Sequence, residues 1–285
     1  MRSEWISIQG TGEWNEDAVV VHEAQGIYGV IDGATSLVPF RGTHGETGGR
    51  LASHLVKEYI EGLPPDTESG TLETLMKEAN RRLGEAMLEN GIDLAAKDQL
   101  WTAGFALIRV TDHGIEYAQA GDCMIFAIYE DGSVRTVTRD HVAHIDEESR
   151  QIWEQGIASG IGSKATLWEQ VKPRILANKE KMNTLHGYSV MNGKPDAEMF
   201  FEYGRLNRIC LQGLLLITDG LFFPREIGHS LLDPETELWR QVQAEGLQNY
   251  ANWLLDLERE DPECIRIPRF KVSDDKSAVW LRLDA

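Results

Sequence analysis

Cysteine is scarce in this chain of 285 residues. Cys123, Cys210 and Cys264 are its three cysteines, and their spacing matches neither a metal-binding motif nor a disulfide framework. An odd and sparse set of thiols is typical of proteins from a reducing compartment. We therefore expect a cytoplasmic protein in which the thiols are structural.

Long hydrophobic runs and linkers are also missing. No stretch approaches the roughly 20 apolar residues of a membrane-spanning helix, and the N-terminus, Met1 to Trp5, lacks the apolar core of a signal peptide. No segment rich in glycine and serine, or in proline, divides the chain. These absences predict a soluble protein without a membrane partner, folded as one domain over residues 1–285.

Positive charge is in short supply. The chain has 28 Lys and Arg residues against 46 Asp and Glu residues, which gives a net charge of −18. A surface field of this sign repels nucleic acids and anionic membranes. We therefore expect no nucleic-acid partner.

One acidic residue ends a strongly apolar stretch. Residues 27–33 have the composition of a buried strand that ends in Asp32-Gly33, and Gly33 is free to take an unusual backbone angle. The run 18–22 before it predicts an antiparallel partner, joined by a turn at 24–26. Such a hairpin brings Glu16 and Asp17 to the same sheet edge as Asp32. Alone, an Asp-Gly pair after a strand is typical of an ordinary turn.

The remaining pattern separates helices from strands. Helical spacing predicts helices over 51–60, 72–87 and 235–257, and strand composition predicts strands over 105–110, 115–120, 124–129, 134–137, 214–217 and 278–281. A hairpin is expected over 187–191, turned by Asn192-Gly193. The short links between strands allow hairpins but no helical crossovers. We expect an α+β fold with two largely antiparallel sheets packed face to face and helices outside.

Residues 141–185 do not fit this regular pattern. They predict helices near 147–155 and 164–181, with Pro173 interrupting or kinking the second. We expect this segment to be an inserted flap over one edge of a sheet. Whether it acts as a lid or as a recognition surface stays open.

Five carboxylates fall at predicted strand ends or junctions: Glu16, Asp32, Asp122, Asp219 and Asp274. If they converge, like charges would raise one another's pKa unless cations neutralise them. Oxygen ligands without histidine or cysteine favour Mg²⁺ or Mn²⁺ over zinc. A pair of such ions bridged by water can generate hydroxide and clamp a phosphoryl group.

The acidic motifs also occur in a definite order. They are Asn15-Glu16-Asp17-Ala18, Asp32-Gly33, Gly121-Asp122, Thr138-Arg139-Asp140-His141, Thr218-Asp219-Gly220 and Asp274-Asp275-Lys276-Ser277. The set resembles that of the metal-dependent type 2C serine/threonine protein phosphatases, over nearly the whole chain. The resemblance implies a four-layer α-β-β-α sandwich with a binuclear centre at one end.

The resemblance also implies which residues hold the ions. Asp32 would bridge two Mn²⁺ or Mg²⁺ ions, and the Gly33 carbonyl would bind one of them. Glu16 would serve the second ion, while Asp219 and Asp274 would serve the first.

Asp122 has a separate place in this resemblance. It resembles the aspartate that helps to hold a third, looser metal in bacterial members. Considered alone, a carboxylate at this strand junction is typical of a turn residue.

Two positions depart from the family pattern. Family members carry an arginine for the substrate phosphate where this chain has Gly12, and many carry a proposed general-acid histidine where it has Ala34. We hypothesise that the loop 34–45 supplies substitutes, with Arg41 as the phosphate ligand and His44 as the acid. The alternative is that both are ordinary solvated loop residues.

The sequence thus favours a Mn/Mg-dependent phosphatase acting on phosphoserine or phosphothreonine in a phosphorylated protein. Two alternatives stay open. One is a binding or regulatory module that keeps the fold but has lost efficient catalysis, and the other is a hydrolase of a small phosphorylated metabolite. The sequence does not specify the substrate, the physiological metal or the oligomeric state.

Overall fold

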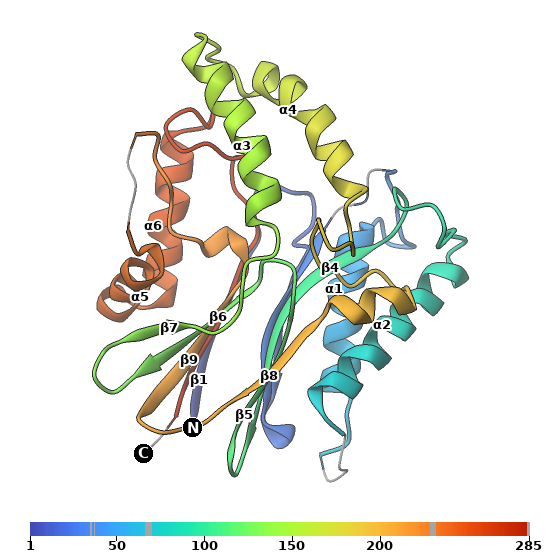
Figure 1. The fold of residues 1–285 in the computed structure, drawn as a ribbon, viewed down its shortest axis with the longest axis vertical. Helices are drawn as coiled ribbons and strands as arrows, with labels where there is room; N and C mark the ends of the chain where they lie inside the picture. The colour runs from blue at the N-terminus through green and yellow to red at the C-terminus, as the bar shows by residue number, and fades with distance from the viewer. Residues whose placement is uncertain (35, 37, 66–69, 229–231, 284–285) are drawn as a thin grey trace.

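The strands form two five-stranded antiparallel sheets (Figure 1). The computed structural model describes residues 1–34, 36, 38–65, 70–228 and 232–283. One sheet has the order β1-β10-β9-β6-β7 and the other β2-β3-β4-β5-β8. The strands are β1 (Arg2–Ile8), β2 (Asp17–His22), β3 (Ile27–Ala34), β4 (Thr102–Thr111), β5 (Gly114–Ala120), β6 (Met124–Tyr129), β7 (Val134–Thr136), β8 (Glu202–Leu206), β9 (Leu211–Ile217) and β10 (Lys276–Arg282).

Helices cover the outer face of each sheet. Helices α1 (Gly48–Glu61) and α2 (Leu72–Glu89) share a buried apolar cluster with the β2–β8 sheet. Helices α5 (Pro234–Glu245) and α6 (Leu247–Glu260) do the same on the β1–β7 sheet. A third cluster fills the space between the two sheets. The arrangement confirms the expected α+β fold, because each sheet buries one face on the other sheet and one on helices.

The predicted hairpin of residues 18–22 and 27–33 is present. β2 and β3 pair antiparallel, with Asp17 directly opposite Asp32. Side chains alternate along a strand, and Tyr28 and Val30 lie in the core between the sheets while Ile31 faces the helices. The same alternation places Asp32 on the inter-sheet side, where the hydrophobic residues of β3 end.

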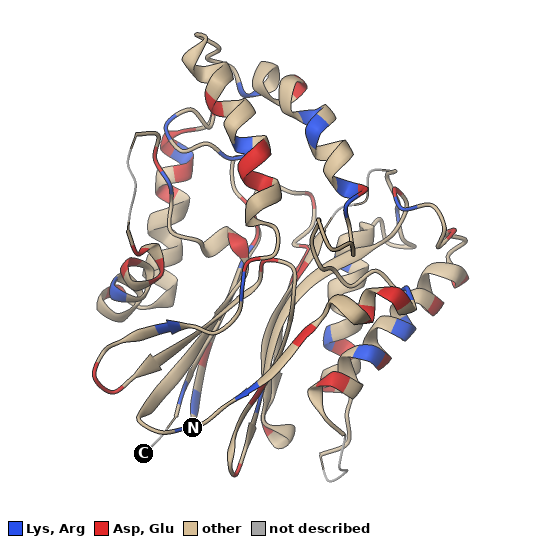
Figure 2. Cartoon of the chain, in the orientation of Figure 1, with Lys and Arg blue, Asp and Glu red and all other residues tan. Residues whose placement is uncertain are grey.

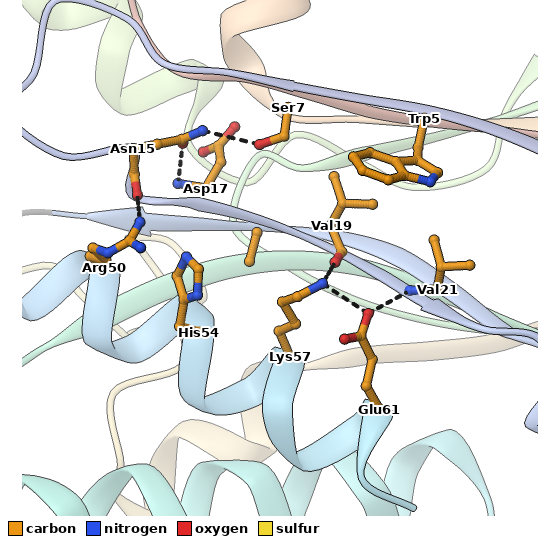
Figure 3. A pocket seen from close by; sticks show the side chains of 11 residues that line it. Trp5, Ser7, Asn15, Asp17, Val19, Val21, Arg50, His54, Lys57 and Glu61 are labelled. Carbon is orange, nitrogen blue, oxygen red and sulfur yellow. Dashed lines mark hydrogen bonds and ion pairs between the residues drawn. The ribbon is translucent and has the colours of Figure 1, made fainter. Parts of the chain in front are cut away.

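β2 is an edge strand, and side chains of α1 cover its outer edge (Figure 3). The Lys57 ammonium donates to the Val19 carbonyl, and the Val21 amide donates to Glu61 Oε1 at 3.0 Å. These contacts satisfy backbone groups that an edge strand otherwise leaves open to another chain. A cavity of about 250 Å³ remains between α1 and this edge, and Asp17 is among its lining residues.

Helices α3 (Ala143–Ala158) and α4 (Lys164–Lys179) occupy the segment 141–185, in which two helices were expected. They pack on each other at one end of the sheets (Figure 1). Their own small core contains Trp153, Leu167 and Val171 and includes Cys264 from the C-terminal part. α4 contains Pro173 and continues through it, so the expected interruption is absent.

Several sequence expectations were wrong in detail. The long helix expected over 235–257 is two helices, α5 and α6, separated at Gly246, whose φ of 84° is unsuitable for a helix interior. The hairpin expected over 187–191 is absent, since Met191 forms an isolated bridge with Ala103. Strands β1 and β8 were not anticipated. Among the described helices, none combines the length and apolar character needed to cross a membrane.

Candidate active site

The ends of β2, β3 and β9 bring acidic residues to one rim of the inter-sheet space. Leu214 and Leu216 of β9 lie in the core between the sheets, so Thr218 follows them on the same side. Thr218 Oγ1 donates a hydrogen bond to Asp17 Oδ2 at 2.8 Å, which joins the two sheets directly. Both side chains are buried.

Asp32 and Asp219 meet at this rim, although they come from different sheets. Their carboxyl groups are close enough for each to affect the pKa of the other. Desolvation raises the pKa of Asp32 well above its usual range, and the charges of Asp17 and Asp219 raise it further. Desolvation and the charge of Asp274 raise the pKa of Asp219 to about 6. Raised pKa values allow the pair to share a proton.

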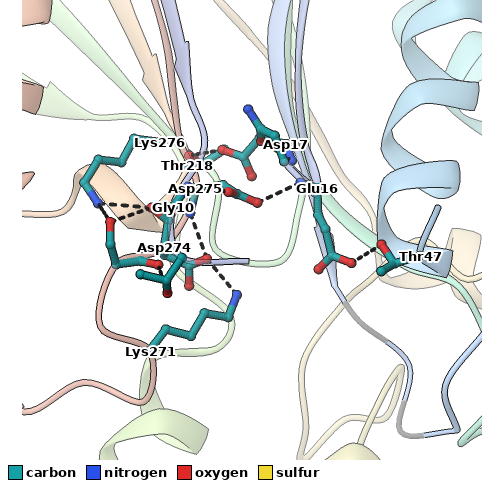
Figure 4. Close-up of polar contacts among 12 residues, drawn as sticks. Gly10, Glu16, Asp17, Thr47, Thr218, Lys271, Asp274, Asp275 and Lys276 are labelled. Carbon is teal, nitrogen blue, oxygen red and sulfur yellow. Dashed lines mark hydrogen bonds and ion pairs between the residues drawn. The ribbon is translucent and has the colours of Figure 1, made fainter. Parts of the chain in front are cut away.

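Glu16 is held beside the start of α1. Its carboxylate accepts a hydrogen bond from the hydroxyl of Thr47, the N-cap residue of that helix, and the helix N-terminus favours negative charge there. The backbone amide of Glu16 donates to Asp275 Oδ2 at 2.7 Å, and that of Gly10 donates to Asp275 Oδ1 at 2.8 Å (Figure 4). Asp275 therefore fixes the 10–16 loop to the segment before β10.

The two Asp-Gly glycines allow close packing at this rim. A Cβ on Gly33 would lie 2.1 Å from the Gly49 carbonyl oxygen, and one on Gly220 would lie 1.9 Å from that of Asp275. Gly33 is an ordinary strand residue of β3, outside the set of positive-φ glycines. Gly33 does not use its freedom to take an unusual backbone angle, and close backbone approach is what requires glycine here.

Asp122 extends the acidic cluster toward the flap. It follows Gly121, whose φ is 81°, at the turn where the chain passes from β5 in one sheet to β6 in the other. Desolvation raises its pKa well above the usual range, and the charges of Asp219 and Asp140 add to this. Asp146, in the first turn of α3, also lies close enough to interact with this acidic cluster. Desolvation and the charges of Asp219 and Asp140 raise its pKa to about 7.

Asp274 lies at the same rim and is paired with a lysine. The Lys271 Nζ atom is 2.7 Å from Asp274 Oδ1 (Figure 4). Desolvation lowers the pKa of Lys271, but the carboxylates of Asp274, Asp32 and Asp219 outweigh it and hold the pKa above its ordinary value. Lys271 therefore carries a positive charge close to the acidic cluster.

The donor set suits hard divalent cations. All the side-chain donors are carboxylate oxygens, as Mg²⁺ and Mn²⁺ prefer, and Asp219 Oδ1 is a buried oxygen without a hydrogen-bond partner. Such an oxygen is costly unless it gains a partner. Within the described ranges, no three His, Cys, Asp or Glu side chains are arranged to hold an ion as they stand. Asp274 forms an ion pair with Lys271.

Arg41 and His44 lie in a loop beside the 11–14 segment. Arg41 Nη2 is 2.7 Å from Glu13 Oε2 in an exposed ion pair, and the indole of Trp14 donates to the Gly45 carbonyl. The guanidinium is thus next to the segment that contains Gly12. The backbone amide of His44 donates to Glu46 Oε2 at 2.9 Å. Residues 35 and 37 of this loop fall outside the described residues.

Asp146 and Lys271 were not singled out from the sequence. Asp146 lies in a helix of the flap, and Lys271 lies in irregular chain before β10, so neither follows a strand. Strand-end patterns could not find them. The Lys271-Val272-Ser273-Asp274 spacing was the only local signal, since it puts an ammonium within reach of a carboxylate.

Comparison with known families decides the class of this fold. The chain matches the family profile described as protein phosphatase 2C over residues 7–257. The chain belongs to the protein phosphatase 2C family. Membership agrees with the resemblance that the ordered motifs carried, and it supports phosphate-ester hydrolysis as the class of reaction. None of the curated proteins compared with this phosphatase 2C chain matched it.

Solved structures of bacterial phosphatases share the fold. Stp1 from Staphylococcus aureus is 16% identical with a TM-score of 0.59, covering 99% of this chain and 95% of that one. Mycobacterium tuberculosis PstP/Ppp is 18% identical with a TM-score of 0.59, covering 100% and 99%. The PstP catalytic domain in complex with 2 manganese ions is 18% identical with a TM-score of 0.57, covering 99% and 97%.

Proposed function

We propose that this chain hydrolyses phosphoserine and phosphothreonine in cytoplasmic proteins, using two Mn²⁺ or Mg²⁺ ions. The observation that carries the proposal is the meeting of Asp32 and Asp219 across two sheets. Carboxyl groups with raised pKa values and a buried oxygen without a partner are expected where a divalent cation belongs. Family membership supplies independent support.

The proposed ligands are the residues that converge at this rim. Asp32, Glu16, Asp219, Asp274 and the Gly33 carbonyl would together hold the two ions. Asp122 would help to bind a third ion. Bound divalent ions would supply an activated water and neutralise charge on the phosphoryl group.

Other residues of this chain would handle the substrate. Arg41, beside the segment that contains Gly12, would bind phosphoryl oxygens through its guanidinium. His44 would give a proton to the serine or threonine oxygen as the P–O bond breaks. The water oxygen ends on the phosphorus, and the alcohol leaves with the proton.

The test is hydrolysis of p-nitrophenyl phosphate and of a phosphothreonine peptide with Mn²⁺ or Mg²⁺. We expect metal-dependent turnover that falls more than about 100-fold in Asp32→Asn, since the bridging carboxylate is lost. Arg41→Ala should raise KM for both substrates. His44→Ala should lower kcat for the peptide more than for the aryl ester, whose leaving group needs no proton.

The control variant is Asp131→Asn. Asp131 lies in the β6–β7 turn, and β6 starts next to Asp122 and runs away from the rim. It should behave like the unmodified protein. Absence of turnover with any divalent ion, in protein shown to bind Mn²⁺, would contradict the proposal. Phosphopeptide binding without turnover would indicate a binding module, and turnover of small phosphate esters alone would indicate a metabolite hydrolase.

A further inference from the structure

A lysine lies beside the acidic cluster at the rim, and its side chain is accessible to solvent. Lys271 is paired with Asp274 at 2.7 Å, yet 56% of its side chain is exposed. Its ammonium is also close enough to Asp32 and Asp219 to interact with their charges. Lys271 therefore lies at the solvent-exposed side of the carboxylate cluster.

A second lysine approaches the same place from the flap. Lys179 is the last residue of α4, and Lys and Arg residues occur along this helix down to the end that approaches the sheets (Figure 2). Desolvation lowers the pKa of Lys179, the carboxylate of Glu16 raises it, and the ammonium of Lys271 lowers it. Lys179 and Lys271 lie on separate segments of the chain and are close enough for their charges to interact.

The solvent-exposed ammonium of Lys271 can donate to the oxygens of a phosphate group, and charge-assisted hydrogen bonds to phosphate are among the stronger ones in proteins. Position 12 contributes no cation, because it is Gly12. A divalent ion on Asp274 would also free the Lys271 ammonium for another acceptor.

We propose that Lys271, with Lys179 beside it, binds the phosphoryl oxygens of the substrate at this centre. The inference rests on the proposed phosphatase function and adds a residue-level basis for phosphate binding in this chain. It also gives the flap a role, since α4 delivers one of the two cations. Arg41 would contact the phosphate from the loop side.

The test measures binding rather than turnover. Calorimetric titration of orthophosphate into Mn²⁺-loaded protein should show that Lys271→Ala weakens phosphate binding by about tenfold or more. This is the loss expected for one charged hydrogen bond. Lys271→Arg should keep most of the affinity, and Lys179→Ala should show a smaller loss. Mn²⁺ affinity should be unchanged or higher in Lys271→Ala, because a competing cation has been removed.

The matched control is Lys77→Ala. Lys77 forms an exposed ion pair with Glu73 on helix α2, with the same N–O distance of 2.7 Å but away from the rim. It should leave phosphate and Mn²⁺ binding unchanged. Thermal unfolding of each variant verifies that it is folded.

Two results would overturn the inference. Unchanged phosphate affinity in Lys271→Ala would remove Lys271 from phosphate binding, and weaker Mn²⁺ binding with unchanged phosphate affinity would make it only a support for Asp274. Failure of this inference can be distinguished from failure of the proposed function. Normal turnover in Lys271→Ala would leave the phosphatase intact, whereas Lys271-dependent phosphate binding without turnover would leave this inference intact.

Discussion

Together, the carboxylates at the rim carry more negative charge than the neighbouring cations balance. Desolvation and the neighbouring charge of Asp274 raise the pKa of Asp219 to about 6, against about 3.9 for an ordinary aspartate. Desolvation and the charges of Asp17 and Asp219 raise the pKa of Asp32 as well. The folded, metal-free protein therefore holds protons on these residues that the unfolded chain would release.

This predicts that the metal-free protein loses stability as pH rises. Between the ordinary and the raised pKa, the folded state binds more protons than the unfolded state, so the free energy of unfolding falls until pH passes about 6. With solvent screening, we expect a loss on the order of 1–2 kcal/mol from Asp219. Urea unfolding in the presence of EDTA, from acid to neutral pH, measures it.

Asp219→Asn is the matched comparison, since the amide has the same shape and does not titrate. It should flatten the pH dependence of the free energy of unfolding. Saturating Mn²⁺ should also reduce the loss in the unmodified protein, because bound cations stabilise the ionised carboxylates. An identical pH dependence in Asp219→Asn would show that Asp219 titrates normally.

At the scale of elements, the segment before β10 depends on a buried ion pair. Lys276 is fully buried, and its Nζ lies 2.9 Å from both carboxylate oxygens of Glu258 on α6. The same ammonium donates to the Asp274 carbonyl and to Ser273 Oγ, both at 3.1 Å. The pair thus ties α6 to the backbone that positions Asp274.

We predict that Lys276→Met destabilises the protein by about 3–5 kcal/mol, because Glu258 would be left as a largely buried charge without its partner. Thermal and urea unfolding measure the change. A second variant, Lys276→Met with Glu258→Leu, removes both charges and should recover much of the loss. Equal stability of Lys276→Met and the unmodified protein would show that the ion pair contributes nothing.

Strand ends were the most predictable elements of the site. Asp32 and Asp219 each follow a short apolar run that is buried on both faces, so composition alone predicted their positions. Glycine was harder to interpret. Gly246 separates α5 from α6 by its backbone angle, while Gly33 is required by the nearness of Gly49, and the sequence does not distinguish these two reasons.

At the scale of the whole molecule, the site forms because two sheets end at the same rim. Asp32 comes from one sheet, Asp219 and Asp274 adjoin the other, and the Thr218–Asp17 hydrogen bond joins them. The sequence predicted each strand end but only the resemblance predicted their convergence. The positions of Asp146, in α3, and of Lys271, in the irregular chain before β10, depend on long-range packing and could not be predicted from local patterns.

The most direct test of the account is calorimetric titration of Mn²⁺ into metal-free protein. If carboxylates from both sheets form one cation site, Asp32→Asn and Asp219→Asn should each weaken Mn²⁺ binding by about 100-fold or more, while Asp131→Asn at the far turn should not. Mn²⁺ binding that is unchanged in both rim variants would contradict the account.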